Sequence, residues 1–309
     1  MNKKKIWIDT DTGVDDSIAI FCASKLDCLD IVGISAVCGN AEIEKTFKNA
    51  RDVVYMAGKD YKVYKGAHKP LVYDLKTAPS VHGINGMGDA VLPESPAIIE
   101  DKPAWDALYE KAKELNGELN VVAIGPLTNI ALTLRYHPDF KNYCKEIYIM
   151  GGAAIGGNIT PCSEFNIYAD PHAAKEVFDS GIFVNMFGLD ATSKALLNKD
   201  DIDEIISYNN PVSNLFRDST GYALRFYEIE KVYGLCEHDS CPIIYLAYPE
   251  LFKYEDCGVY VETEGELTRG ETVVDIWSRA RFNDRHCRVF LDVDTKAFAK
   301  VLKDLYKLF

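Results

Sequence analysis

The sequence predicts an α/β fold: one domain over residues 1–309, built on a doubly wound, mostly parallel sheet, with its site at the C-terminal ends of the strands. Two observations predict this fold class. Short apolar runs alternate along the chain with helical patterns, which is typical of parallel strands joined by helical crossovers. The chain, 48% hydrophobic, can also bury a sizeable core without disulfides, and no linker, repeat or low-complexity segment divides it.

The alternation predicts six strands in the first two thirds of the chain. They are expected at residues 6–8, 29–37, 61–64, 119–124, 146–150 and 183–189. The helices between them are expected at residues 15–26, 43–57, 105–115, 129–136 and 171–180. The remainder is expected to form a helical stretch rich in Tyr and Phe (200–231), three strands (257–263, 271–276 and 287–291) and a last helix (295–308).

Charge and cysteine content narrow the class of protein. A net charge of −13 argues against a nucleic-acid partner and against an anionic membrane surface, because both require a basic patch. The nine cysteines form an odd, scattered set without C-x-x-C spacing, as expected of reduced thiols in a cytoplasmic protein. No segment is long enough to span a bilayer, and the apolar run behind residues 3–5 is too short for a signal peptide.

The most informative motif directly follows the first predicted strand. There Asp9, Asp11, Asp15 and Asp16 place four carboxylates within eight residues. At one strand end, four carboxylates repel one another and raise their own pKa values unless a cation or hydrogen-bond donors compensate them. The motif therefore predicts a site for a hard, oxygen-binding cation.

Three other interpretations of this motif are weaker. An EF-hand loop also begins D-x-D, but it needs Gly and Glu where this chain has Val14 and Ile20. A phosphotransferase of the haloacid-dehalogenase type would make Asp9 the nucleophile, and Gly13 stands where that family usually has Thr or Val. A plain helix N-terminus favours acidic residues through the macrodipole, but this accounts for only one or two of the four.

Other polar or glycine positions also fall at strand ends. Asn40, Gly125 and Gly151 each lie at or just beyond the end of a predicted strand, as Asp9 and Asp11 do. In open parallel sheets this edge is where ligands bind. We therefore expect these distant segments to meet in one cleft.

The pattern D-x-D-x-G-x-D-D resembles the N-terminal signature of the nucleoside hydrolases, the inosine-uridine preferring N-ribohydrolase family. Further segments resemble the family in its own order: Cys38-Gly39-Asn40, Gly125-Pro126-Leu127-Thr128-Asn129, Met150-Gly151-Gly152, Glu164-Phe165-Asn166, Asp170-Pro171 and His238-Asp239. The resemblance spans roughly residues 5–245. It implies hydrolysis of ribonucleosides to free base and ribose, a salvage reaction.

The resemblance also implies Ca²⁺ as the metal. The ion would be held by Asp11, Asp16, Asp239 and the backbone carbonyl of Ile124. It would also hold a water and the ribose 2′- and 3′-hydroxyls, which suits an ion that takes six to eight oxygen ligands. Asp11 would act as the general base on the metal-bound water that attacks C1′.

The same resemblance assigns residues to the ribose. Asp15 and Asn40 would bind its 2′-hydroxyl side, and Asn158, Glu164 and Asn166 its 3′- and 5′-hydroxyls. Met150 would line the sugar pocket. Phe165 is either a sugar contact or an ordinary packing residue.

A second group of residues is expected near the nucleobase. His238 stands where one subgroup of the family has a proton donor for the leaving base, and a histidine can titrate near neutral pH. His82, on a glycine-rich loop, either closes over the base or is a solvated loop residue. Tyr222, Phe226 and Tyr227 could contact the base, although aromatic residues at helical spacing are more often core.

The sequence thus predicts a Ca²⁺-dependent ribonucleoside hydrolase with an oxocarbenium-like transition state. A D-x-D phosphohydrolase using Mg²⁺ and a non-catalytic nucleoside- or pentose-binding module are the alternatives. No partner protein is expected, and the resemblance suggests a homodimer or homotetramer. The base preference depends on loops near residues 75–89 and 222–235, and it stays open.

Overall fold

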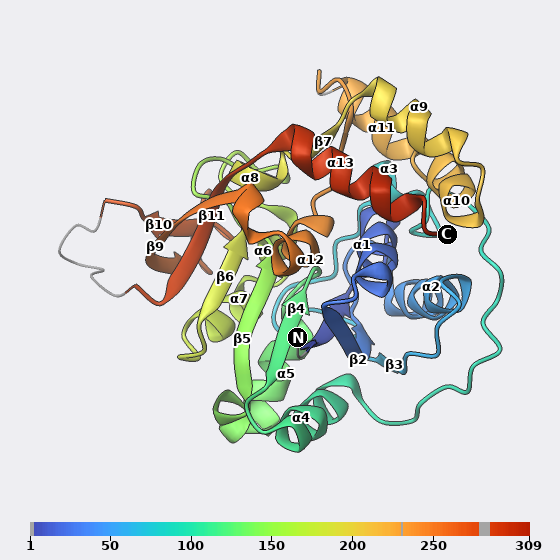
Figure 1. Cartoon of the computed structure of the whole chain (residues 1–309). Helices are drawn as coiled ribbons and strands as arrows, with labels where there is room; N and C mark the ends of the chain where they lie inside the picture. The colour runs from blue at the N-terminus through green and yellow to red at the C-terminus, as the bar shows by residue number, and fades with distance from the viewer. Residues whose placement is uncertain (1–2, 230, 278–284) are drawn as a thin grey trace.

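A nine-stranded mixed sheet runs through the centre of the molecule (Figure 1). The structure is a computed structural model that describes residues 3–229, 231–277 and 285–309. The strands follow the order β10-β9-β11-β6-β5-β4-β1-β2-β3 across the sheet. Their bounds are β1 (Lys4–Thr10), β2 (Leu29–Ala36), β3 (Val63–Lys65), β4 (Leu119–Ala123), β5 (Cys144–Met150), β6 (Val184–Phe187), β9 (Phe252–Val261), β10 (Thr272–Asp275) and β11 (Cys287–Val293).

The α/β class and the mostly parallel sheet are confirmed. Strands β1 to β6 pair in parallel, and β11 continues the parallel part beside β6. Within this sheet β9 is the reversed strand: near one edge it pairs antiparallel both with β11 and with the edge strand β10. The three tail strands therefore extend the predicted six-stranded sheet. A separate two-stranded pair joins β7 (Leu196–Leu197) to β8 (Leu235–Cys236).

Helices cover both faces of this sheet. One core includes side chains of α1 (Val14–Lys25), α2 (Ile43–Met56), α12 (Ser240–Ala247) and α13 (Thr295–Tyr306). The other core includes side chains of α4 (Ala104–Leu115), α5 (Thr128–Tyr136) and α7 (Pro171–Phe178). The remaining helices are α3 (Pro79–His82), α6 (Phe165–Ala169), α8 (Leu189–Thr192), α9 (Lys199–Ser207), α10 (Pro211–Ser219), α11 (Gly221–Ile229) and two 3₁₀ turns, η1 (Pro138–Asn142) and η2 (Pro249–Leu251).

The helical stretch predicted over residues 200–231 is divided into α9, α10 and α11. Between α9 and α10, Asn209 adopts a left-handed backbone (φ 49°), and Asn210 then caps α10 by accepting the Ser213 N–H at 2.8 Å. Pro211 follows at the first helical position, where it needs no amide hydrogen. The sequence pattern did not predict helix α12. Its residues are apolar on nearly every side, so apolar and polar positions do not alternate with the period of a helix.

The ends of the parallel strands lie level at one edge of the sheet. Thr10 of β1 pairs with Ala36 of β2, and Met150 of β5 pairs with Phe187 of β6. The segments that follow these strands therefore meet above one edge, as predicted for the cleft.

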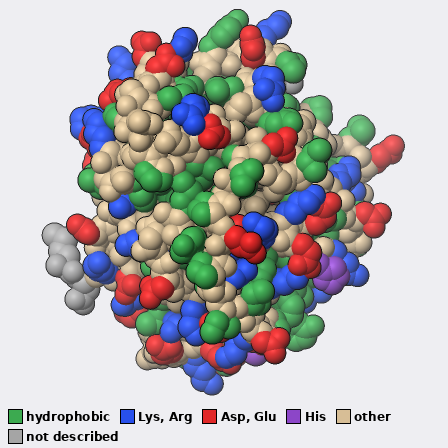
Figure 2. All heavy atoms as spheres, turned by 90° about the vertical axis from the view of Figure 1, so that its right-hand side faces the viewer, with side chains coloured by type: hydrophobic (Ala, Val, Ile, Leu, Met, Phe, Trp, Pro, Cys, Tyr) green, Lys and Arg blue, Asp and Glu red, His purple; other side chains and the backbone are tan. Residues whose placement is uncertain are grey.

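On the face drawn in Figure 2, acidic and basic side chains are interspersed, so the negative charge is not gathered there in one patch. All nine cysteines are free thiols, and seven of them are buried. Among the described residues, no helix combines the length and the apolar character that a bilayer crossing requires.

An aromatic cluster joins the tail strands to the parallel part of the sheet. The rings of Phe187 (β6) and Phe290 (β11) stack with their centroids 3.8 Å apart, and Tyr245 packs against both edge-on.

We expect Phe290→Ala to lower the free energy of unfolding by about 3–5 kcal/mol, and Phe290→Leu by about 1 kcal/mol. Urea unfolding measures both. A loss below about 1 kcal/mol for the alanine variant would contradict a role in holding this edge.

Candidate functional site

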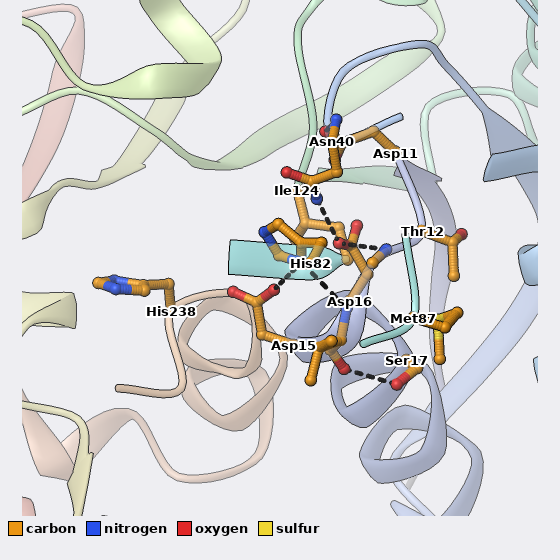
Figure 3. Close-up of polar contacts among 12 residues, drawn as sticks. Asp11, Thr12, Asp15, Asp16, Ser17, Asn40, His82, Met87, Ile124 and His238 are labelled. Carbon is orange, nitrogen blue, oxygen red and sulfur yellow. Dashed lines mark hydrogen bonds and ion pairs between the residues drawn. The ribbon is translucent and has the colours of Figure 1, made fainter. Parts of the chain in front are cut away.

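The first loop of the chain holds the centre of the site. β1 ends at Thr10, and α1 begins at Val14 with Gly13 as its N-cap, so Asp11 lies in the loop while Asp15 and Asp16 lie in the first turn of α1 (Figure 3). The acidic residues in this turn face the positive end of the helix macrodipole. Strand and helix thus bring three carboxylates to one place.

Asp11 is completely buried. Its Oδ2 accepts the backbone N–H of Asn40 at 2.7 Å, whereas its Oδ1 has no hydrogen-bond partner among the described residues. Two glycines allow the backbone to close around this carboxylate: a Cβ on Gly39 would overlap it, and one on Gly125 would lie 2.6 Å from Oδ1. The site therefore presents one free, buried carboxylate oxygen that no protein group satisfies.

Asp15, Asp16 and Asp239 form a second acidic group beside Asp11. One carboxylate oxygen from each lies within 4.8 Å of the others. Asp16 is held in place by Thr10 Oγ1, which donates to Oδ1 at 2.5 Å, and by the Gly13 N–H, which donates to Oδ2 at 2.8 Å. The sequence predicted Asp16 and Asp239 as metal ligands but assigned Asp15 to the ribose, and the structure gathers all three.

Burial raises the pKa values of these carboxyl groups. The pKa of Asp15 and that of Asp16 rise to about 6, and those of Asp11 and Asp239 rise well above the usual range. Desolvation is the main cause in each case, and repulsion from neighbouring carboxylates adds to it for Asp11, Asp16 and Asp239. A cation among these oxygens would offset both effects.

The donor set fits a hard cation such as Ca²⁺. Every candidate ligand atom is an oxygen, and one of them, Asp11 Oδ1, is buried without a partner. The carbonyl oxygen of Ile124, another predicted ligand, lies at the end of β4 and accepts the side-chain amide of Asn166 at 3.1 Å. The same amide donates to the Met150 carbonyl oxygen at 3.1 Å, so Asn166 joins the ends of β4 and β5.

Glu164 anchors the segment that carries the predicted ribose ligands. It is buried and caps α6, accepting the N–H groups of Asn166 at 2.9 Å and Ile167 at 3.2 Å, and it also accepts the Gly152 N–H at 2.9 Å. Burial raises the pKa of Glu164 to about 7. Asn158 is exposed, and its Oδ1 accepts the N–H of the half-buried Phe165 at 2.9 Å. These two residues therefore lie nearer to solvent than Glu164.

His82 is buried against the start of α1. Its Nδ1 accepts the Val14 N–H at 3.3 Å and lies 4.0 Å from an Asp15 carboxylate oxygen (Figure 3). Burial lowers the pKa of His82 to about 4. The alternative of a solvated loop histidine is therefore wrong, and the loop is folded over the acidic group.

His238 lies to one side of the carboxylates in Figure 3. Its Nε2 is 3.0 Å from the hydroxyl of Tyr227, and its Nδ1 is 2.8 Å from the hydroxyl of Thr192. Burial lowers the pKa of His238 to about 4, so the imidazole is neutral near pH 7. Burial also raises the pKa of Tyr227 well above its usual value, so its hydroxyl keeps its hydrogen.

The other two aromatic residues of α11 differ in their contacts. The Tyr222 hydroxyl donates to the Asp89 carboxylate at 2.7 Å and so ties α11 to the loop that carries His82. Phe226 packs edge-on against Tyr227, with ring centroids 5.7 Å apart. Tyr227 alone of these three contacts a predicted catalytic residue.

Two residues that hold the site were not predicted. Asn49 of α2 donates to the carbonyl oxygens of Thr12 at 3.1 Å and Asn85 at 3.0 Å, which joins the first loop to the His82 loop. Thr192 contacts His238. Asn49 falls among the apolar positions of an amphipathic helix, and a polar residue there is a signal that the sequence offers. Nothing in the sequence near Thr192 marks that residue.

Comparison with known proteins identifies one family. The model of the inosine-uridine preferring nucleoside hydrolases matches residues 6–300. The pyrimidine-specific ribonucleoside hydrolase RihA of Escherichia coli O1:K1 / APEC is 38% identical over 307 residues, with 98% of each chain covered. A purine-preferring ribonucleoside hydrolase from Gardnerella vaginalis superposes with a TM-score of 0.91 at 32% identity, covering 99% of this chain and 100% of the other. The plant nucleoside hydrolase PpNRh1 gives a TM-score of 0.92 at 29% identity, covering 98% and 99%.

If the site holds a divalent cation, we expect Gly39→Ala to weaken its binding by roughly 10- to 100-fold, because the added methyl group displaces the Asp11 carboxylate from its position. Isothermal titration calorimetry measures the affinity. Gly58→Ala is the control. A Cβ at position 58 meets no atom within 4 Å, so the site should be unaffected, although the left-handed backbone there (φ +67°) should lower the free energy of unfolding by about 1 kcal/mol. Unchanged affinity in Gly39→Ala would contradict a role for Asp11 in cation binding.

The Glu164 pKa predicts a pH dependence of stability. Because the folded-state pKa is about 7 and the ordinary value is 4.5, the folded protein holds this proton more tightly than the unfolded chain. The stabilisation is complete below about pH 4.5 and is lost as the pH rises through about 7, a change of roughly 3 kcal/mol at most. Glu164→Gln should not lose stability in this way. Between pH 5 and pH 8, its free energy of unfolding, measured with urea, should therefore rise relative to that of the wild type. If the free energies of unfolding of the two proteins changed with pH in parallel, the raised pKa of Glu164 would be contradicted.

Proposed function

The chain belongs to the inosine-uridine preferring nucleoside hydrolase family and is a ribonucleoside hydrolase, and from this premise we propose that it works with Ca²⁺ and uses Asp11 as its general base. The observation that carries the proposal is the buried, unpartnered Oδ1 of Asp11 beside the acidic group of Asp15, Asp16 and Asp239. A carboxylate oxygen without a donor is costly unless a cation or a substrate proton meets it.

In this proposal Asp11, Asp16, Asp239 and the Ile124 carbonyl hold the ion, and Asp15 stands close enough to join them or to bind the ribose. The ion, when bound, supplies positive charge that acidifies water and orients a vicinal diol. Asp11 takes the proton of the water that attacks C1′. The free Oδ1 supports this role, because its lone pairs are not used by the protein.

The ribose binds between the two groups of polar side chains. Asn40, which donates its side-chain amide to Asp16 at 3.1 Å, is positioned with Asp15 for the 2′-hydroxyl side. Glu164 and Asn166, with Asn158 at the exposed rim, bind the 3′- and 5′-hydroxyls, and Met150 and Phe165 line the sugar. As the N-glycosidic bond breaks, positive charge develops on the ribose, and the buried carboxylates stabilise that charge.

The nucleobase leaves on the side of His238 and Tyr227. A nucleobase is a poor leaving group unless it is protonated as it departs. The Tyr227–His238 pair supplies a hydrogen-bonded route for that proton. His82, folded over Asp15, and Phe226, packed against Tyr227, are positioned to contact the base. Tyr222 contributes by tying α11 to the His82 loop.

The phosphohydrolase alternative has little support. It requires Asp9 as an accessible nucleophile, but Asp9 is fully buried and its Oδ1 accepts hydrogen bonds from Ser35 and from Asn129, the latter at 2.7 Å. The binding-module alternative predicts binding without turnover, so the same assay tests it. A homodimeric or homotetrameric assembly and a cytoplasmic location stay predictions, and light scattering on the purified protein would test the first.

We expect ribose release from at least one of inosine, adenosine, uridine and cytidine, lost after chelation and restored by Ca²⁺. All four bases are needed because similar relatives include a pyrimidine-specific and a purine-preferring enzyme. Asp11→Asn should lower kcat by roughly 10²- to 10⁴-fold. Asp52→Asn, a change at an equally buried carboxylate on α2 that pairs with Lys48 and Ser95, is the control.

Each outcome bears on a separate part of the proposal. Activity that survives complete metal removal would overturn the Ca²⁺ assignment. Full activity in Asp11→Asn would overturn the general-base assignment. No ribose from any nucleoside, with the protein folded and Ca²⁺ present, would favour the binding module.

A further inference from the structure

Three side chains from distant elements form one hydrogen-bonded chain beside the site. Thr192 ends α8, His238 follows β8, and Tyr227 lies in α11. The Thr192 Oγ1 is 2.8 Å from His238 Nδ1, and His238 Nε2 is 3.0 Å from the Tyr227 hydroxyl. The chain runs from Thr192, which is fully buried, to Tyr227, which is partly exposed.

A small antiparallel pair fixes two of these residues against each other. Leu196 of β7 pairs with Cys236 of β8, and the Glu237 N–H donates to the Ala195 carbonyl oxygen at 2.9 Å. The segments just after Thr192 and just before His238 are therefore held together by backbone hydrogen bonds. The contact between the two side chains is built into the fold and does not depend on two flexible side chains meeting.

The Thr192 hydroxyl is used differently from the hydroxyls of two other buried threonines at helical positions, Thr133 and Thr220. Thr133 and Thr220 donate to the carbonyl oxygen four residues earlier, at 2.8 and 2.7 Å, which is the ordinary choice for a threonine on a helix. In the part of the chain that the structure describes, the hydrogen bond with His238 is the one hydrogen bond of the Thr192 hydroxyl. Its hydrogen is therefore available for His238.

The direction of the Thr192–His238 hydrogen bond sets the direction of the whole chain of hydrogen bonds. A neutral imidazole carries one N–H donor and one acceptor nitrogen. If Thr192 donates to Nδ1, the ring hydrogen must lie on Nε2, which then donates to the Tyr227 oxygen. The Tyr227 hydroxyl hydrogen is then left free to point into the site. With the opposite tautomer, Tyr227 would have to donate to His238 and could not donate to a ligand.

We propose that Thr192 is a positioning residue: its hydroxyl holds His238 in the Nε2–H tautomer, so that Tyr227 presents its hydroxyl proton to the leaving nucleobase. This proposal rests on the proposed function, and it names Tyr227 as the group that gives the leaving nucleobase its proton. As the C1′–N bond breaks, its electron pair stays with the base, which takes the Tyr227 proton. The phenolate accepts a hydrogen bond from His238 and regains a proton from solvent, while Asp11 releases to solvent the proton that it took from water.

The first test compares a nucleoside with a nitrophenyl riboside, whose leaving group departs without protonation. Thr192→Val should lower kcat on the best natural nucleoside by roughly 10- to 100-fold, with KM nearly unchanged, and should leave the nitrophenyl riboside within about twofold of wild type. Thr192→Ser should restore the nucleoside rate. Thr133→Val, which removes a hydroxyl of equal burial from α5, is the control.

The same assay separates failure of this proposal from failure of the proposed function. Equal losses on both substrates, or no loss on the nucleoside, would overturn the positioning role of Thr192. If the wild type released nothing from either substrate with Ca²⁺ present, the proposed function itself would fail.

A second measurement does not depend on activity or on a folded Thr192 variant. Long-range ¹H–¹⁵N spectra of the Ca²⁺-saturated wild type, labelled at its six histidines, report which ring nitrogen of each carries the hydrogen. His238→Asn assigns the signal. A hydrogen on Nε2 of His238 supports the proposal, and a hydrogen on Nδ1 overturns it.

Discussion

The gathering of four carboxylates at one point, three of them buried and Asp15 partly so, is the constraint on which the rest of this structure depends. Removing a charged carboxylate from water costs several kcal/mol unless it is paired, and here Asp11, Asp15, Asp16 and Asp239 also repel one another. The fold supplies only part of the compensation, through donors on Thr10, Gly13 and Asn40. One oxygen, Asp11 Oδ1, is left without a donor, and the crowding of negative charge around it favours a positive partner such as a hard cation.

A parallel sheet is well suited to building such a site, because it brings the ends of β1, β2, β4 and β5 level with one another. Three of these ends contribute different kinds of group: carboxylates after β1, a backbone N–H after β2 and a carbonyl after β4. Close approach requires residues without side chains, which explains Gly39 and Gly125 beside Asp11. Asn166 then joins two strand ends with one amide and keeps the Ile124 carbonyl at the site.

The two sides of the site differ in electrostatic character. One side is acidic and favours positive charge, whereas the other consists of three hydrogen-bonding groups without a formal negative charge: the Thr192 hydroxyl, the His238 imidazole and the Tyr227 hydroxyl. Burial keeps the His238 imidazole neutral and keeps the hydrogen on Tyr227. This division matches the needs of glycosidic cleavage, in which the sugar becomes positive while the base gains a proton. Tyr222 and Asn49 tie the His82 loop to the helices and so close the site between the two sides.

The sequence by itself determined the α/β class, the alternation of the first strands and helices, the acidic cluster and the edge of the sheet where it lies. These features depend on interactions within a few residues: hydrophobic period, helix-end chemistry and the spacing of Asp11 and Asp16. Only the tertiary structure decided that Asp15 meets Asp239, that His82 is buried, that β9 to β11 extend the same sheet, and that Thr192 contacts His238. Each of these depends on contacts between segments far apart in the chain, and no local pattern records which distant side chain will fill a given space.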